Sequence, residues 1–331
     1  MRELNPLAHY PWLASAWEPL IRAYEADRVA HALLLHGPAG IGKAALARHY
    51  AQRLLCSVPG PQACGQCPSC LLYHSESHPD FHWLEPEAEG KPIKIDSVRK
   101  LIQDLHLTPQ FSTYRTLIIN QAEQLNTHAV NALLKSLEEP SDRTVWILVT
   151  ERPSRLPATV LSRCQKATVK APGRSEMTQW LQQQAPEADA NALLSAASGS
   201  PLRALGLLGS DIIARRQRRF EAFVGVFSHR HDPVEIAEQW HNDALAETLD
   251  WMLDWVGDLI RLKMTGSSAR LSNPDFGPVF STLVDRLDAP SLLEMRDHVQ
   301  EARNAMGGPS NRQLLIEILL IRWSHLSRRP R

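Results

Sequence analysis

The sequence lacks an excess of charge of either sign. Its 331 residues include 36 lysines and arginines and 36 aspartates and glutamates, so the formal net charge at pH 7 is zero. A protein that binds DNA or an anionic membrane through its overall electrostatic field carries a clear positive excess. The composition therefore argues against non-specific binding to either surface as the main activity.

Long apolar runs and targeting segments are missing as well. No uninterrupted hydrophobic stretch approaches the about 20 residues that a membrane-spanning helix needs. Met1, Arg2 and Glu3 lead into polar and aromatic residues rather than into the apolar region of a secretory signal. We therefore expect a soluble, cytoplasmic protein with no membrane partner. Hydrophobic residues make up 44% of the chain, and its length suits two or three domains.

Cysteine is scarce, and four of the five cysteines lie in one short segment. Cys64, Cys67 and Cys70 are separated by two residues each, and Cys56 precedes them at the end of a helical pattern. In a reducing compartment such clustering favours a metal over disulfides. The spacing allows a knuckle to bring three thiolates to one ion, and Cys56 can supply a fourth.

We therefore predict a closed structural Zn²⁺ site formed by these four cysteines, in an insertion that spans residues 56–70. Prolines and glycines in the segment supply its tight turns. Two alternatives stay open: the thiols are buried or free without a metal, or His74 or His78 replaces one cysteine as a ligand. We expect no catalytic role for this ion.

A glycine-rich segment runs from Gly37 to Ala44, between an apolar run at 32–35 and a helical pattern at 45–55. Strand, glycine turn and helix together form the context in which a GxxxxGK pattern binds phosphate. Glycines let backbone N–H groups surround the phosphate, the helix N-terminus adds positive potential, and a lysine reaches the terminal phosphates. The predicted nucleotide-binding residues are Gly37, Gly40, Gly42 and Lys43.

Two positions argue against hydrolysis at this loop. The residue after the lysine should carry a hydroxyl that ligates magnesium, but it is Ala44. The buried strand 116–120 should end in two acids, one for magnesium and one for the attacking water, but it ends in Asn120 and Gln121. Glu123 lies farther along, where it is better placed to cap or pair. The sequence predicts a degenerate site: ATP binding stays open, and hydrolysis is not expected.

The apolar runs favour a parallel sheet that is covered on both faces. Further strands are predicted at 79–84, 144–150 and 165–169, and helices at 126–139 and after a cap at Asp96 or Ser97. Residues 1–29 predict a short helical lead-in. Thr150, at a strand end, is either a sensor of the γ-phosphate or an exposed strand-end residue.

Beyond Pro172-Gly173 the pattern is helical to the end of the chain. Short helices are predicted at 175–184, 188–197 and 201–208. Longer ones are predicted at 211–228, 234–264, 277–287, 290–305 and 309–327, separated by proline, glycine and aspartate.

The order of four motifs resembles that of a bacterial clamp-loader AAA+ subunit. These motifs are the glycine loop, the cysteine cluster, the segment 131–140 (NALLKSLEEP) and Leu161-Ser162-Arg163-Cys164. The resemblance covers roughly residues 1–210 by motif and the remainder by architecture alone. It implies an α/β AAA+ fold: a P-loop-like domain at 1–170 carrying the zinc knuckle, a helical lid domain at 171–209, and an all-α collar domain for oligomerisation at 210–331.

The same resemblance implies roles for two arginines. Arg163 matches the arginine finger that such subunits offer in trans to a neighbour's γ-phosphate, and its alternative is an arginine that pairs locally. Arg203, in Gly-Ser-Pro-Leu-Arg, is similar to the sensor arginine of the second domain, and its alternative is a structural salt bridge. Ala44, Asn120 and Gln121 place the chain with the non-hydrolysing subunit of such a loader.

The implied partners are ATPase subunits of the gamma/tau type and a clamp-opening subunit of the delta type. The sliding clamp and primer-template DNA would be reached through this hetero-oligomer, within a DNA-directed DNA polymerase (nucleotidyltransferase) holoenzyme that serves DNA replication. Two other functions are alternatives. A self-sufficient ATPase motor is favoured by Lys43, with Glu123 as the missing acid, and disfavoured by Ala44 and Asn120. A zinc-dependent nucleic-acid-binding module conflicts with the zero net charge.

Overall fold

The structure of the chain, a computed structural model, describes residues 6–88, 91–104, 111, 114–266, 271–306 and 311–327. Contacts divide the chain into two compact units, Met1–Pro172 and Gly173–Arg331. Within the described ranges, no helix is both long and apolar enough to cross a bilayer.

A five-stranded parallel sheet forms the centre of the first unit, in the order β2-β3-β4-β1-β5. The strands are β1 (Ala32–His36), β2 (Phe81–Leu84), β3 (Arg115–Asn120), β4 (Thr144–Thr150) and β5 (Gln165–Thr168). The three inner strands are almost wholly buried, as their continuous apolar runs predict. The predicted strands are confirmed, with small shifts of their ends.

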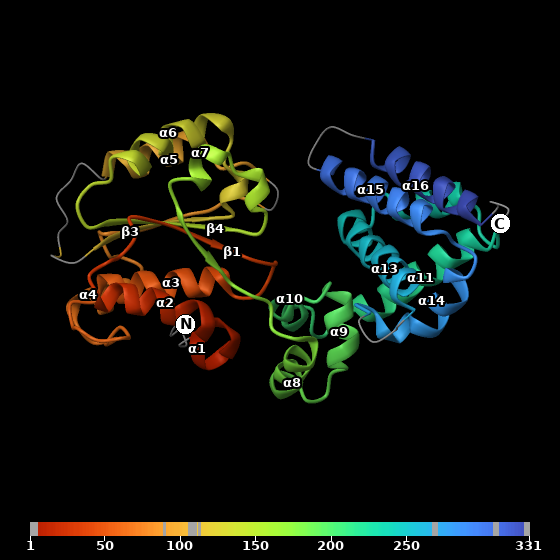
Figure 1. Ribbon diagram of the computed structural model, residues 1–331, viewed down its shortest axis with the longest axis horizontal. Helices are drawn as coiled ribbons and strands as arrows, with labels where there is room; N and C mark the ends of the chain where they lie inside the picture. Colours follow the sequence, from red (N-terminus) through yellow and green to blue (C-terminus); the bar gives the residue numbers. More distant parts are fainter. Residues whose placement is uncertain are drawn as a thin grey trace. The chain divides into compact units, whose positions relative to one another are not determined.

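Helices cover both faces of this sheet (Figure 1). One face carries α2 (Ala14–Glu25), α3 (Lys43–Leu55) and α4 (Pro68–His74), and the other carries α5 (Ile95–Asp104), α6 (Thr127–Glu138) and α7 (Ala158–Leu161). Single turns complete the unit: α1 (Pro6–His9), η1 (Pro11–Leu13), η2 (Ala122–Gln124) and η3 (Pro153–Arg155). On the α5–α6 side, Val130, Leu133 and Leu137 of α6 join Leu117 and Trp146 of the sheet in one core. The predicted fold class, a P-loop parallel sheet covered on both faces, is confirmed.

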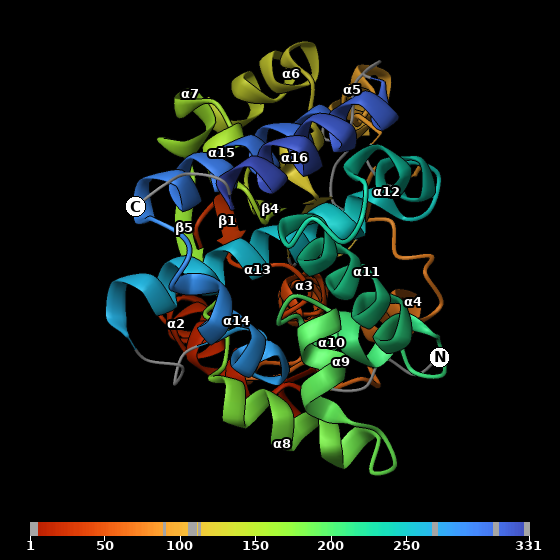
Figure 2. The same ribbon diagram turned by 90° about the vertical axis from the view of Figure 1, so that its right-hand side faces the viewer.

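The second unit is wholly helical in its described residues. Its three short helices are α8 (Arg174–Gln184), α9 (Ala190–Ala196) and α10 (Pro201–Gly206). The longer part consists of α11 (Ile212–Phe227), α12 (Pro233–Trp240), α13 (Leu245–Thr265), η5 (Pro274–Phe276), α14 (Gly277–Val284), α15 (Ala289–Ala305) and α16 (Arg312–Leu326). The last two of these helices lie side by side (Figure 2). The predicted start of the last helix, at 309–310, lies outside the described residues.

The prediction of one helix over 234–264 is wrong, because α12 ends at Trp240 and α13 begins at Leu245. Ala244 has a φ of +47°, in the left-handed region that no α-helix continues through. The break is held from α11, where Arg219 donates to the carbonyl oxygen and to the carboxylate of Asp243, at 3.1 and 2.7 Å. This tertiary contact has no counterpart in the local pattern.

Helices α8 and α9 are joined to the longer part by buried and partly buried polar contacts. The Trp251 indole N–H of α13 donates to the carbonyl of Ala196 at 2.7 Å. Arg174, at the start of α8, donates to the carbonyl of Ser272 at 2.7 Å and to the hydroxyl of Ser195 at 2.8 Å. The hydroxyl of Ser195 donates in turn to the same Ser272 carbonyl, at 3.1 Å. The second unit is therefore a single packed body.

Acid should weaken the first unit through His49 of α3. Its ring lies 4.6 Å from that of Trp17, and its buried Nε2 atom has no hydrogen-bond partner among the residues that the structure describes. Burial lowers the pKa of His49 from 6.5 to about 4. Above pH 6.5 the ring is neutral in both states. As the pH is lowered from 6.5 to 4, the unfolded chain takes up a proton on His49 that the folded chain excludes. The contribution of His49 should therefore reduce the free energy of unfolding by about 1.4 kcal/mol for each unit by which the pH is lowered.

The measurement is chemical denaturation between pH 7 and 4 of the wild-type chain and of His49→Leu, which keeps an apolar contact with Trp17. The difference between the two curves isolates this group. Identical pH dependence would show that His49 titrates normally in the folded chain.

Candidate functional sites

Two glycines fix the shape of the loop between β1 and α3. A Cβ atom on Gly37 would lie 2.1 Å from the carbonyl oxygen of Val169, so a side chain there would displace the backbone after β5. Gly42 has a φ of +93°, in the left-handed region that favours glycine, and is the N-cap residue of α3. The predicted strand, glycine turn and helix are all present.

Lys43 is held by its own loop. Its side chain is only 4% exposed, and its ammonium group donates to the carbonyl of Pro38 and lies 3.8 Å from the carboxylate of Glu151. Burial lowers the pKa of Lys43, while the nearby carboxylates of Glu151 and Glu123 oppose this shift. A phosphate that bound here would compete with Pro38 and Glu151 for the ammonium.

The N-terminal lead-in packs on the outside of the same loop. The indole N–H of Trp12 donates to the carbonyl oxygen of Ile41 at 2.8 Å, in a buried contact. Side chains of Tyr10 and Leu13 come within 3.3 Å of the position that a Cβ atom on Gly42 would take. The loop is thus immobilised on its outer side by residues that the motif itself does not contain.

The end of β3 has no pair of acids at its tip. The side-chain amide of Asn120 donates to the carboxylate of Glu85 at 3.2 Å, and Gln121 has a φ of +56°. Glu123 accepts from the backbone N–H of Glu151 at 3.3 Å, which is the pairing expected for it. Thr150 is fully buried, and its Oγ1 accepts from the N–H of Arg152 at 3.1 Å, so the expectation of an exposed strand-end hydroxyl is wrong.

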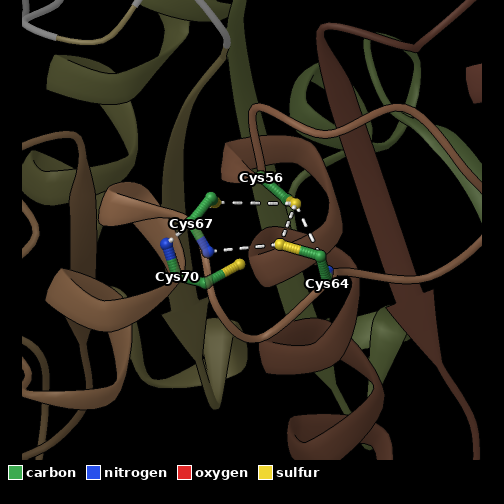
Figure 3. Close-up of side chains that lie close together, drawn as sticks. All are labelled: Cys56, Cys64, Cys67 and Cys70. Carbon is green, nitrogen blue, oxygen red and sulfur yellow. Dashed lines mark hydrogen bonds between the residues drawn. The ribbon is translucent and has the colours of Figure 1, made fainter.

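The four clustered cysteines converge on one point (Figure 3). Their sulfur atoms lie within 4.8 Å of one another, with Cys56 Sγ 3.6 Å from Cys64 Sγ and 3.8 Å from Cys67 Sγ. Four sulfurs at about 2.3 Å around a tetrahedral zinc are about 3.8 Å apart. The spacing and chemistry of the donors therefore fit Zn²⁺ bound by four thiolates.

Backbone N–H groups point at these sulfur atoms. Cys64 Sγ accepts from the amides of Gln66 and Cys67 at 3.5 and 3.3 Å, and these two bonds lower the pKa of the Cys64 thiol. Cys67 Sγ accepts from the amide of Cys70 at 3.4 Å, in the first turn of α4. The sequence predicted turns for this segment but not the helix α4, which begins at Pro68 directly after Cys67.

The alternative ligands lie outside the cluster. His78 is buried and its Nε2 atom is 2.8 Å from the hydroxyl of Ser69, while His74 Nε2 is 3.1 Å from Gln52. The fifth cysteine, Cys164, belongs to the hydrophobic core beneath α6 and α7, and burial raises the pKa of its thiol to about 11. It behaves as a core residue.

Arg163 lies on the surface of the first unit, directly after α7. Its guanidinium donates to the carbonyl of Thr159 at 2.8 Å and to the hydroxyl of Ser162 at 3.4 Å, and it forms an ion pair with Glu138 at the end of α6. Its side chain remains 33% exposed. Since the next residue, Cys164, is buried, the turn is anchored and the arginine faces outward.

Arg203 lies in an ion-pair network within the second unit. It donates to Glu247 at 3.0 Å and lies 3.9 Å from Asp250, both on α13. Arg215 and Arg303 bind the same two carboxylates at 2.6 Å each. The structural salt bridge weighed for this residue is therefore present.

The sheet order, with a glycine loop after the strand that lies between β4 and β5, is that of the AAA+ class of P-loop proteins. Family descriptions match both parts of the chain: "DNA polymerase III, delta subunit" over residues 12–172 and "DNA polymerase III, delta subunit, C terminal" over residues 210–325.

Two relatives that match nearly the whole chain at more than 30% identity carry the same name. The DNA polymerase III subunit delta' of Pseudomonas aeruginosa is 38% identical over 96% of this chain and 98% of its own length. That of Escherichia coli is 33% identical over 96% of this chain and 95% of its own length. The chain belongs to the delta-prime family of DNA polymerase III subunits. A tau/gamma subunit of Haemophilus influenzae is 26% identical over 95% of this chain and 51% of its own length.

Removing one thiol should release the metal. We expect about one zinc per wild-type chain and a clear loss in Cys67→Ser, with a lower unfolding temperature, because a three-ligand site binds zinc more weakly and metal binding contributes to folding. Metal analysis and thermal denaturation with and without chelator measure both effects. Cys164→Ala is the matched control: it should keep its zinc although it loses core packing. Well under one zinc per wild-type chain, with Cys56 and Cys64 reactive in the native protein, would contradict the site.

Proposed function

We propose that this chain is the non-hydrolysing stator of a DNA polymerase III clamp loader. With ATPase subunits and a clamp-opening subunit, it would help to load the sliding clamp on primed DNA. The observation that carries the proposal is the contrast between the two sites of the first unit. At the glycine loop, Lys43 is bound by Pro38 and Ala44 offers no magnesium ligand, whereas Arg163 is presented on the surface.

Arg163 would act on a nucleotide that another subunit holds. A guanidinium placed at a γ-phosphate stabilises the charge that develops during transfer. Its ion pair with Glu138 is partly exposed, and pairs of this kind contribute little to stability. A phosphate, which accepts two parallel hydrogen bonds from arginine, can therefore displace the carboxylate at small cost. The ion pair with Glu138 would hold the Arg163 side chain in place until the neighbouring subunit binds.

The remaining parts serve assembly under this proposal. The cysteines Cys56, Cys64, Cys67 and Cys70 would hold Zn²⁺, which supplies a structural cross-link and no catalysis. Residues 171–209 would form the lid and 210–331 the collar through which the chain joins gamma/tau-type and delta-type subunits. Contacts with primer-template DNA would be made mainly through the assembly, in keeping with the zero net charge.

A self-sufficient motor is the second candidate. Lys43 and Glu123 favour it, because the two charged groups interact across the loop. Two contacts argue against the motor: Glu123 accepts a hydrogen bond from the backbone N–H of Glu151, and the Lys43 ammonium donates to the Pro38 carbonyl.

Truncating the arginine should slow the assembly and not the isolated chain. In a reconstituted loader, Arg163→Ala should reduce hydrolysis at the interface it serves by about 10³-fold or more. The DNA- and clamp-stimulated rate should then fall to what the other sites supply. Arg155→Ala, an exposed arginine of η3, is the matched control and should leave the rate unchanged. An intact complex with an undiminished rate in Arg163→Ala would rule out the finger.

Substitution of Lys43 distinguishes the stator proposal from the motor proposal. Under the stator proposal, Lys43→Ala leaves ATP turnover of the assembly at the wild-type level, because its ammonium serves its own loop rather than a phosphate. The isolated wild-type chain should show no turnover above background. Hydrolysis by the isolated chain that is lost in Lys43→Ala would instead establish the motor.

A further inference from the structure

Arg53, in the last turn of α3, is a fully buried arginine beside the cysteine cluster. One terminal nitrogen donates to the carbonyl of Gln62 at 2.6 Å. The other donates to the carbonyls of Cys56 and Val58, at 3.0 and 2.8 Å, and to the hydroxyl of Tyr24 at 2.9 Å. Three of its four partners are therefore backbone carbonyls of one short segment.

That segment, residues 56–62, connects the first metal ligand to the approach of the second. It contains Pro59, Gly60 and Pro61 and belongs to no helix or strand. All of its residues are described, and residues 57–62 form no backbone–backbone hydrogen bond with the described parts of the chain. The guanidinium of Arg53, with its donors in a rigid planar fork, therefore holds three carbonyls of this segment in place. Other contacts of the segment are with the cysteines themselves, such as that of Cys56 Sγ with the Val58 carbonyl at 3.6 Å.

The charge of Arg53 has an aromatic contact, since its Cζ lies 4.8 Å from the centroid of the Tyr24 ring, but no counter-charge among the described residues. Within the described part of the chain, no carboxylate lies within ion-pair distance of its guanidinium, although the side chain has no exposed surface. A buried cation without a counter-charge is costly. Four thiolates around one Zn²⁺ carry a net charge of two minus, and one of those thiolates belongs to Cys56, whose carbonyl Arg53 already binds.

We propose that Arg53 is the positioning residue of the metal centre: it orders the 56–62 segment and supplies the positive charge that balances the tetrathiolate. The proposal rests on the zinc site inferred above. Among the described residues, none of the hydrogen bonds of Arg53 goes to a cysteine sulfur. Its effect is therefore on the position of the thiolates and on the stabilisation of their negative charge. Loss of a residue that orients the ligands without binding the metal itself weakens metal affinity by about 10- to 100-fold.

The test compares zinc affinity in four forms of the full chain by competition with a chromophoric chelator. Arg53→Met should lower the affinity about 10- to 100-fold, and Arg53→Lys, which keeps the charge but not the fork, should fall between Arg53→Met and the wild type. Arg48→Met is the matched control. Arg48 is also on α3, but its guanidinium lies over the ring of Trp83, so its loss should not change zinc affinity.

A second readout separates positioning from ordinary destabilisation. The free energy of unfolding is measured for wild type and Arg53→Met, each with zinc and with chelator. A positioning role predicts that Arg53→Met lowers the free energy of unfolding more in the zinc form than in the metal-free form. Equal losses in both forms, or unchanged zinc affinity in Arg53→Met and Arg53→Lys, would overturn the proposal. If Arg53→Met does not fold, the affinity of Arg53→Lys decides. A wild-type chain that binds no zinc would defeat the metal site itself, and this proposal with it.

Discussion

Parallel pairing of β1 between β4 and β5 is the constraint on which the candidate sites of the first unit depend. In this register His36 lies opposite Thr150 on one side and Thr168 on the other, and Asn120 of β3 lies opposite Val149. Because parallel strands end at the same edge, the glycine loop, the tip of β3 and the residues after β4 are forced together there. The contact of Gly37 with the Val169 carbonyl shows how closely the chain is packed at this edge.

The glycine loop at this edge is contacted by other parts of the chain on two sides. On one side, the ammonium of Lys43 donates to the Pro38 carbonyl and lies 3.8 Å from Glu151, and on the other, Trp12 donates to the Ile41 carbonyl. Arg163 differs in kind, since its partner Glu138 is a surface carboxylate that solvent or another anion can replace. The two groups thus differ in their surroundings: Lys43 is buried among its own loop's partners, whereas Arg163 is paired with a partly exposed carboxylate.

Strong local patterns in the sequence predicted most of the fold and the four cysteine ligands. The apolar runs of β1, β3 and β4 and the two-residue spacing of Cys64, Cys67 and Cys70 leave few alternatives. The parts that were missed depend on contacts between distant residues. Trp12 reaches Ile41 across 29 positions, Arg219 breaks the helix at Asp243 across 24, and neither partner is marked by its neighbours in sequence. The burial of Thr150 depends on sheet neighbours in the same way.

The polar contacts inside the second unit have a mechanical meaning. Ala196, Ser195 and Arg174 belong to the short helices, yet their hydrogen-bond partners Trp251 and Ser272 belong to the longer part, and Arg203 is tied to α13 by charge. Any rotation of the short helices against the longer ones would therefore have to break these hydrogen bonds and ion pairs.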